Sequence, residues 1–349
     1  MKIRLFLTFD HELPLGSLKT SYKKALFDPT EKLFESAAKN EVPITLFTDI
    51  LCALRYRQWD RQGFYKPYET QLQKAVSLGH DVQLHLHPHW LTSGFENGVV
   101  IPSQDYSLSD FKNNKEPGIA EVVRSGAALL KEICEQENSK YKILAFRAGG
   151  FNIEPGSMEI FSQLTKNGIK YDSSVVLKYY FVSALSLVDF RKLPEFPNWF
   201  IGTDGNFRQA ADSGIFEIPV AAIPKTPFEI PTSFKLKHFA HRAPENHGTM
   251  IHERSQGSRM QKLHMLFSAR MLTFDNHTLS ANYLMQILDY NVKRFSSSDT
   301  INLASCSHPK TMGNYSFQLM DRFIEMARKK YPDIEFATFE RLNKLNHTN

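Results

Sequence analysis

Three histidines lie within five positions of the chain, in the run His85-Leu86-His87-Pro88-His89. Alternate residues of a strand point to the same face, so His85 and His87 share one face of the strand that they end. Pro88 then interrupts the strand, and His89 can turn back toward the same point. Imidazole is a common ligand of divalent transition metals, so the run predicts a metal site.

Two carboxylates follow the first predicted strand, which covers residues 3–9. Asp10 and Glu12 are two positions apart, so their side chains point the same way. One carboxylate with two imidazoles makes a three-ligand site that leaves positions open for water and substrate. An ion in such a site polarises a substrate carbonyl, and a second carboxylate can act as general base. A lone histidine at a strand end is more often structural, but the two groups together favour a metal site.

The elements that must position these residues alternate between short apolar runs and amphipathic stretches, a pattern typical of an α/β fold with a parallel sheet. We expect strands at 3–9, 42–48, 81–87, 143–146, 215–220, 301–306 and 334–339, and a short strand that reaches residue 171. Helices are expected from about 29, up to 79, at 118–137, up to 168, at 282–294 and at 316–330. Seven or eight such units favour a distorted (β/α) barrel, with a doubly wound sheet as the alternative. We treat residues 1–349 as one barrel domain.

Polar residues follow these strands at their carboxyl ends. In a (β/α) barrel all of these ends share one face, and that face holds the active site. Segments that are far apart in the sequence would therefore meet in one pocket. Asp49 could equally cap the next helix, and we assign it no role. In chain order the residues are Asp10, His11, Glu12, Asp49, His85, His87, His89, Arg147, Asp172 and His308.

Five short motifs span residues 8 to 309. They are Thr8-Phe9-Asp10-His11-Glu12, His85-Leu86-His87-Pro88-His89, Phe146-Arg147-Ala148-Gly149-Gly150-Phe151, Tyr171-Asp172-Ser173-Ser174 and Ser307-His308-Pro309. In this order they resemble the motifs of the polysaccharide deacetylases, the NodB-homology proteins of carbohydrate esterase family 4. The residues of these motifs are most similar to those of deacetylase-like proteins from surface-polysaccharide gene clusters.

The resemblance implies a divalent ion held by Glu12, His85 and His89, with zinc expected first and nickel, cobalt, iron or manganese as alternatives. The family's first motif usually has adjacent aspartates, whereas here His11 takes the second place and Glu12 follows. Glu12 shares a strand face with Asp10, which favours it as the ligand. His11 as ligand, or Asp10 itself on the metal, remains open.

The resemblance also implies hydrolysis of an N-acetyl or other acyl group on a sugar or polysaccharide precursor. Asp10 would be the general base, Arg147 would hold and tune it, and His308 would protonate the leaving amine. The expected substrates are acetylated sugars, sugar nucleotides or oligosaccharides. Where the family's third motif has a proline shortly after the arginine, this chain has Ala-Gly-Gly, so the floor of the pocket can differ.

The formal net charge is +5 and the sequence pI is about 8.9. This mild excess suits an anionic substrate, but an ordinary solvated surface gives the same balance. The sequence has no basic run with interleaved aromatic residues, so nothing in it indicates a nucleic-acid partner. Three widely separated cysteines imply no disulfide framework and fit a reducing compartment. With neither a signal peptide nor a membrane span in view, we expect a cytoplasmic protein of undetermined oligomeric state.

Between about residues 178 and 280 the regular alternation is lost and prolines are frequent. Long irregular segments in compact folds are usually functional or disordered, so we expect an insertion that acts as a lid or recognises substrate. A solvated surface excursion is the alternative. Its candidate residues are Trp199, Arg208, Lys235, Lys237, His238, His241, Arg242, His247 and His252.

Three other functions compete with this one. A cysteine hydrolase could use Cys306 and His308, which share a strand face, although no nucleophile signature surrounds the cysteine and a buried thiol is the simpler interpretation. A barrel that binds a metal or a glycan without turnover would have no need of a base and an acid. The third alternative is a hydrolase of another carbon–nitrogen bond.

Overall fold

The computed structural model describes residues 1–112, 116–226, 247 and 258–347. Its largest sheet has the strand order β11-β12-β8-β7-β4-β3-β2, and a second sheet has the order β15-β1-β16. The bounds are β1 Lys2–Phe6, β2 Thr8–His11, β3 Thr45–Asp49, β4 Asp81–Leu86, β7 Ala145–Ala148, β8 Tyr171–Asp172, β11 Trp199–Ile201, β12 Ile215–Glu217, β15 Thr300–Ala304 and β16 Glu335–Phe336.

The two sheets close into a barrel. Phe9 at β2 bridges Ser307 beyond β15, and Val220 beyond β12 bridges Ala304 of β15, both in parallel. The pairs from β2 through β3, β4, β7 and β8 to β12 are parallel as well. The predicted distorted (β/α) barrel is therefore the observed fold, and the doubly wound alternative is wrong, because an open sheet has two free edges.

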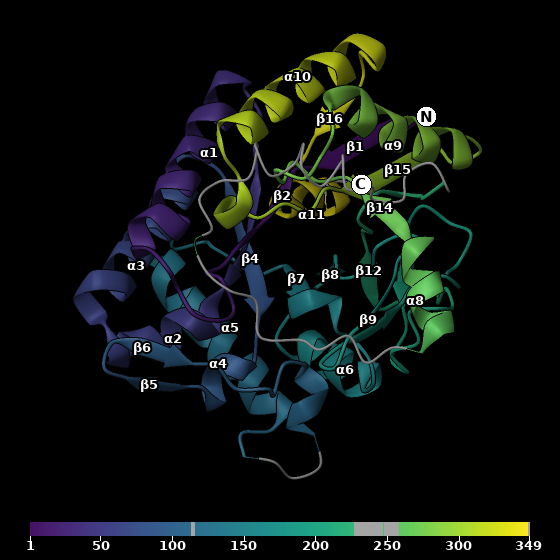
Figure 1. The fold of residues 1–349 in the computed structure, drawn as a ribbon. Helices are drawn as coiled ribbons and strands as arrows, with labels where there is room; N and C mark the ends of the chain where they lie inside the picture. Colours follow the sequence, from purple (N-terminus) through teal and green to yellow (C-terminus); the bar gives the residue numbers. More distant parts are fainter. Residues whose placement is uncertain (113–115, 227–246, 248–257, 348–349) are drawn as a thin grey trace.

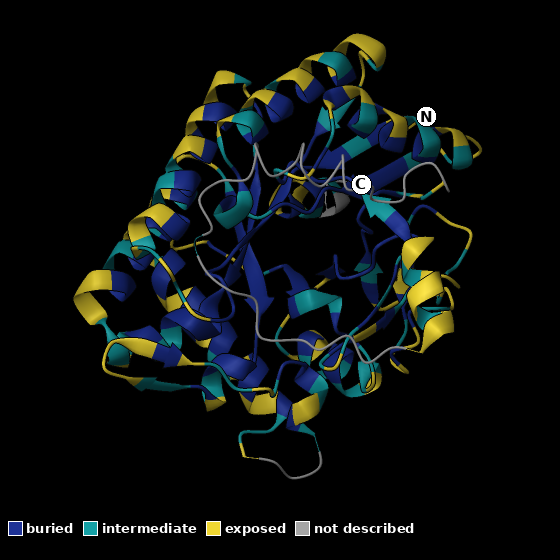
Figure 2. Cartoon of the chain, viewed as in Figure 1, coloured by how far each residue is buried: buried dark blue, intermediate teal, exposed yellow. Residues whose placement is uncertain are grey.

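Helices surround the barrel on its outside (Figure 1). They are α1 Asp28–Lys39, α2 Ile50–Trp59, α3 Lys66–Ser77, α4 His89–Thr92, α5 Ile119–Glu135, α6 Ser157–Lys166, α8 Arg259–Leu266, α9 Ala281–Arg294 and α10 Asn314–Lys330. The last helix, α11 Phe339–His347, lies inside this ring in the view of Figure 1, and its Phe339 packs on Phe6 and Phe47. The apolar faces of the longer helices pack inward and their outer faces are exposed, whereas α8 has no buried residue (Figure 2). Every residue of β3 and β4 is buried, as expected for parallel strands that are covered on both sides.

The structure corrects several expected bounds. The strand expected at 3–9 is divided into β1, which pairs with β15 and β16, and β2, which pairs with β3. The strand expected at 334–339 is only Glu335–Phe336, and α11 begins at Phe339.

The described part of 178–280 holds more regular structure than the sequence predicts. Besides the expected β12 it contains α8, β11, β9 Tyr180–Val182, β10 Leu187–Asp189, β13 Ala222–Pro224 and β14 Ala269–Met271. Three-residue strands are too short to show a periodic apolar pattern.

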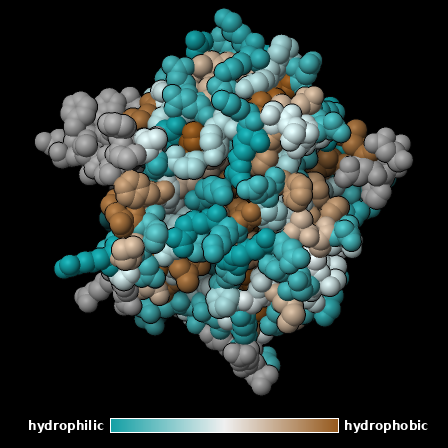
Figure 3. Space-filling model, turned by 90° about the vertical axis from the view of Figure 1, so that its right-hand side faces the viewer, coloured by the Kyte–Doolittle hydropathy of each residue, from teal (hydrophilic) through white to brown (hydrophobic). Residues whose placement is uncertain are grey.

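The surface seen in Figure 3 is mostly hydrophilic, with apolar side chains scattered among polar ones. None of the helices in the described ranges is long and apolar enough to cross a membrane.

Candidate active site

The carboxyl ends of β2, β3, β4 and β7 bring the predicted residues together. Register pairs Asp49 with His85, and His85 with Arg147, on neighbouring strands. Asp10 and Glu12 follow from β2, whose neighbour is β3. All five side chains are buried. The expected convergence at one end of the barrel is thus observed.

Glu12 lies at the centre of a buried group of metal-ligating atoms. Its Oε2 atom is 3.2 Å from His85 Nε2 and 2.5 Å from His87 Nε2, and its Oε1 atom accepts a hydrogen bond from Lys310 Nζ (2.7 Å). Burial alone would raise the pKa of Glu12, but the positive charge of Lys310, followed by His87 and His85, holds it well below its usual range. Glu12 is therefore an anion that faces two imidazoles.

The histidine that accompanies Glu12 and His85 is His87. One ligating atom from each of these three residues lies within 4.8 Å of the other two. His89 is outside this group, and its ring centre is 5.8 Å from that of His87. His89 nevertheless stays a predicted ligand, because its ring is buried and neither ring nitrogen bonds another side chain among the described residues. Burial and the neighbouring His87 hold its pKa well below the usual value, which keeps the ring neutral.

His11 points away from the group around Glu12. Its Nε2 atom is 3.0 Å from Gln71 Oε1, its Nδ1 atom is 3.3 Å from Thr48 Oγ1, and its ring packs on Tyr68. Burial lowers its pKa to about 4. Strand parity thus separates His11 from Glu12 as expected, and the metal assignment itself stays a prediction.

Asp10 is held by Arg147 as the resemblance implied. Arg147 is fully buried and its Nη1 atom donates to Asp10 Oδ1 (2.6 Å), while Nε and Nη2 donate to the carbonyl and hydroxyl oxygens of Ser173 (both 2.9 Å). Its guanidinium also lies over the ring of Phe47. Burial opposes ionisation of Asp10, but Arg147, then His85 and His308, outweigh it and lower the pKa of the carboxyl group. Asp10 is ionised and fixed.

His308 lies opposite Asp10 and carries a proton. Its Nε2 atom is 3.7 Å from Asp10 Oδ2 and 3.8 Å from Glu12 Oε1. Its Nδ1 atom is 2.9 Å from Asp275 Oδ2, and its backbone amide donates to Asp275 Oδ1 (2.8 Å). Burial disfavours the imidazolium, but the charge and hydrogen bond of Asp275, followed by Asp10, raise the pKa of His308 to about 9. The ring is therefore protonated at neutral pH, and its Nε2 atom faces the carboxylate of Asp10.

Asp49 and Gly149 shape the strand end that carries the histidines. Asp49 accepts hydrogen bonds from Trp90 Nε1 (2.6 Å) and from the backbone amide of His87 (3.4 Å), so it fixes the turn around Pro88. A Cβ atom at Gly149 would lie 2.6 Å from His87 Nδ1 and from the carbonyl oxygen of Leu86. Only glycine permits this close approach of β7 to β4.

Cys306 does not have the environment of a nucleophile. Its thiol is buried and lies 3.5 Å from Asp10 Oδ2. Burial, followed by the charge of Asp10, raises the pKa of the thiol well above its usual value. A reactive cysteine needs a lowered pKa, so the cysteine-hydrolase alternative is disfavoured.

The motif residue Asp172 lies on β8, next to the strand β7 that carries Arg147, and it does not belong to the group around Glu12. Ser174 donates to both of its oxygens. Glu217 is its register partner on β12. Burial raises the pKa of both carboxyl groups.

Two of the residues expected in a lid support the fold. Trp199 is buried and its Nε1 atom donates to the carbonyl oxygen of Phe207, and Arg208 pairs with Glu154. The backbone oxygen of His247 accepts from the amide of Lys19. The other candidates, Lys235, Lys237, His238, His241, Arg242 and His252, lie outside the described residues.

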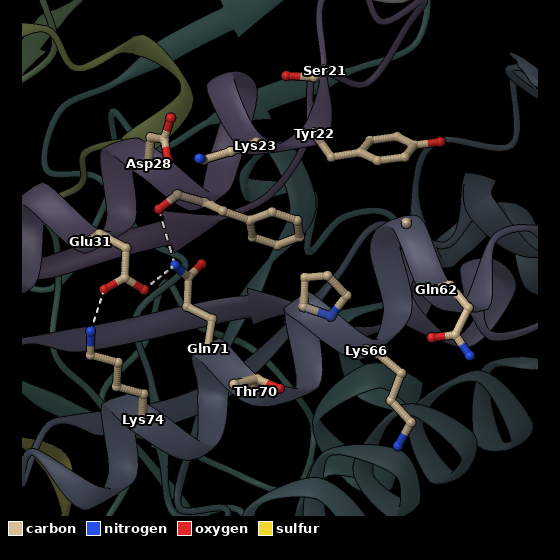
Figure 4. Close-up of a pocket in the computed structure, with 13 residues that line it drawn as sticks. Ser21, Tyr22, Lys23, Asp28, Glu31, Gln62, Lys66, Thr70, Gln71 and Lys74 are labelled. Carbon is tan, nitrogen blue, oxygen red and sulfur yellow. Dashed lines mark hydrogen bonds and ion pairs between the residues drawn. The ribbon is translucent and has the colours of Figure 1, made fainter.

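A cavity of about 660 Å³ opens between α1 and α3 (Figure 4). Among the described residues that line it, none belongs to the predicted catalytic or metal-binding set. Its wall nevertheless includes Gln71, which donates to the carbonyl oxygen of Phe27 and to Glu31 Oε1, and whose own oxygen contacts His11. This network holds the ring of His11, which strand parity directs away from Glu12.

The sequence matches no protein-family model and no curated protein. Among solved structures, one from Mycobacterium smegmatis, provisionally classed as a polysaccharide deacetylase, is 11% identical, with a TM-score of 0.50 over 98% of this chain and 89% of that one. Another from Parabacteroides distasonis, provisionally classed as a glycoside hydrolase/deacetylase, is 11% identical, with a TM-score of 0.52 over 99% of this chain and 71% of that one. The chain has the polysaccharide-deacetylase fold.

Within this polysaccharide-deacetylase fold, the sequence does not predict Asp275, Lys310 or the close contact of His87 with Glu12. Asp275 ends the triplet Thr273-Phe274-Asp275, which repeats the Thr-Phe-Asp that ends in Asp10. The rings of the two phenylalanines pack together, with centres 6.3 Å apart. That repeat was the available signal for Asp275. The only sequence signal for a role of Lys310 in the site is its position two residues after His308.

Proposed function

We propose that this chain is a metal-dependent hydrolase that removes an N-acetyl, or another acyl, group from a sugar or polysaccharide precursor. The observation that carries the proposal is the placement of His308 Nε2 3.7 Å from Asp10 Oδ2, beside Glu12 and His85. The surrounding charges lower the pKa of Asp10 and raise that of His308 to about 9. A base and an acid that lie side by side suit hydrolysis and are superfluous for binding alone. The likeness of the fold to proteins classed as deacetylases agrees with this function.

The residues present fit a divalent ion. One carboxylate oxygen and two imidazole nitrogens converge in a buried place, which is the donor set that catalytic zinc sites use. Glu12 and His85 would hold the ion together with His89, as the motif predicts, or with His87, as the distances favour. The bound ion would polarise the acyl carbonyl and make a water molecule more acidic. Zinc is our first expectation, with nickel, cobalt, iron or manganese as alternatives.

The side chains divide the hydrolysis of an amide between them. Asp10 accepts a proton from water as the oxygen adds to the acyl carbon, and Arg147 keeps the accepting carboxylate in place. As the carbon–nitrogen bond breaks, His308 gives its proton to the leaving amine. Asp275 orients the imidazole and stabilises its charged form. The products are a free carboxylic acid and an amino sugar.

The substrate class and the role of residues 178–280 are part of the same proposal. An acetylated sugar, sugar nucleotide or oligosaccharide of surface-polysaccharide biosynthesis fits an N-acyl hydrolase. The segment 178–280 would cover the mouth of the barrel and recognise the sugar.

The test is release of acetate from a panel of N-acetylated sugars, sugar nucleotides and oligosaccharides. Asp10→Asn should reduce kcat by about 10²–10⁴-fold, because a positioned general base is lost. Asp289→Asn, at an ion pair with Lys330 on the helical surface, is the matched control and should be fully active. If no acylated sugar is hydrolysed while glycans still bind, the chain is a binding barrel and the proposal is wrong.

A further inference from the structure

Lys310 is a buried lysine inside the candidate active site. Its side chain is 8% exposed and lies in the short 3-10 turn Pro309–Thr311, directly after His308. The Nζ atom donates to Glu12 Oε1 (2.7 Å) and to the carbonyl oxygen of Leu13 (3.2 Å). Burying an ammonium group is costly unless it is paired, so Glu12 and Lys310 stabilise each other.

This contact divides the two oxygens of Glu12 between different partners. Oε1 is held by Lys310, whereas Oε2 faces His85 at 3.2 Å and His87 at 2.5 Å. Only one oxygen of the carboxylate is therefore directed at the imidazole nitrogens. A carboxylate without such a partner can offer both of its oxygens to the same ion.

We propose that Lys310 is a positioning residue that holds one oxygen of Glu12 and so restricts Glu12 to a single-oxygen contact with a bound divalent ion. This inference rests on the proposed function, because it needs the ion. Its consequence is a free coordination position, which a catalytic zinc site requires and a structural site lacks. The ammonium group of Lys310 would weaken metal binding, because its positive charge would lie beside a dication. In return, one coordination position of the ion would stay open for water or substrate.

A purely structural role for Lys310 makes different predictions. The bond from Lys310 to the carbonyl oxygen of Leu13 joins the turn of His308 to the end of β2. If that join were its only role, removing the lysine would loosen the site and weaken metal binding. If Lys310 restricts Glu12, removing it strengthens metal binding and still lowers turnover.

The experiment compares Lys310→Met with the wild-type protein, each loaded with zinc after removal of metal. Zinc affinity is measured by competition with a chelator, and the number of zinc ligands by X-ray absorption. We expect Lys310→Met to bind zinc about tenfold more tightly, because a repelling charge is gone, and to gain one oxygen ligand. Its kcat should fall, whereas Lys310→Arg should keep the wild-type ligand number. Lys330→Met removes a lysine that pairs with Asp289 on the surface, and it should change neither the zinc affinity nor the number of zinc ligands.

Circular dichroism checks that each variant folds, and Lys310→Gln replaces Lys310→Met if the methionine variant does not. If the variant without the lysine binds zinc no more tightly than the wild type and has the same number of zinc ligands, the role proposed for Lys310 is wrong. The proposed function would still stand. A wild-type protein that binds no divalent metal would overturn the proposed function and this inference together.

Discussion

Replacing Asp275 with Asn should lower the pKa of His308 and shift the alkaline limit of activity. Asp275 contacts His308 twice, at the ring Nδ1 atom and at the backbone amide. Burial acts against the imidazolium, and the charge of Asp275 is the largest of the effects that overcome it. Asn can keep one of these hydrogen bonds but removes the charge.

The magnitude follows from the pKa of about 9 against the ordinary value of 6.5. This difference corresponds to roughly 3 kcal/mol in favour of the imidazolium, at about 1.4 kcal/mol for each pKa unit. A carboxylate in direct contact typically accounts for about one to three units, and Asp10 and Glu12 remain in the variant. We therefore expect the pKa of His308 to fall by about one to two units in Asp275→Asn.

The assay has two parts. NMR titration of the histidine rings in metal-free protein gives the pKa directly, and kcat/KM against pH gives its effect on turnover. An acid must be protonated, so activity is present below the pKa of His308 and lost as the pH rises through it. The alkaline limb should lie near pH 9 in the wild type and move down in Asp275→Asn, with no such limb in His308→Ala. An alkaline limb that stays in place in both variants would refute the general-acid role.

Three further predictions concern the metal site and its support. Glu12→Ala should lower metal affinity far more than His11→Ala in chelator competition, because only Glu12 faces the imidazoles; the reverse ranking would move the ligand to His11. Gly149→Ala should lower the free energy of unfolding by roughly 1–3 kcal/mol and weaken metal binding, since the added Cβ would press on His87; thermal unfolding with unchanged Tm would contradict this. Asp49→Ala should cost roughly 1–3 kcal/mol in denaturant unfolding through two lost hydrogen bonds, and a loss below about 0.5 kcal/mol would show that these bonds are unimportant.

The sequence predicts well those parts of the site that depend on strand periodicity. Asp10 and Glu12 lie on one face of β2 and His11 on the other, as the two-residue repeat requires. Arg147 reaches Asp10 because parallel strands end at the same side of a barrel. The barrel itself is predictable for the same reason, since the alternation of strands and helices is regular over most of the chain.

The residues whose positions the sequence does not determine lie where periodicity ends. His89 begins the helical turn α4, where its ring packs against Trp90 rather than continuing the strand direction of His85 and His87. Asp275 follows the three-residue strand β14, within the segment that looked irregular. Lys310 stands in a turn after Pro309, where side-chain directions follow from the tertiary structure alone.

Elemental analysis of the purified protein tests the central claim most directly. We predict about one divalent ion per chain in the wild type, held by Glu12, His85 and one further histidine. The double variant His85→Ala/His89→Ala should contain none and keep its circular dichroism spectrum, and His87→Ala identifies which histidine completes the set. A wild type that hydrolyses acylated sugars without any bound metal, or a double variant with full occupancy, would contradict the account.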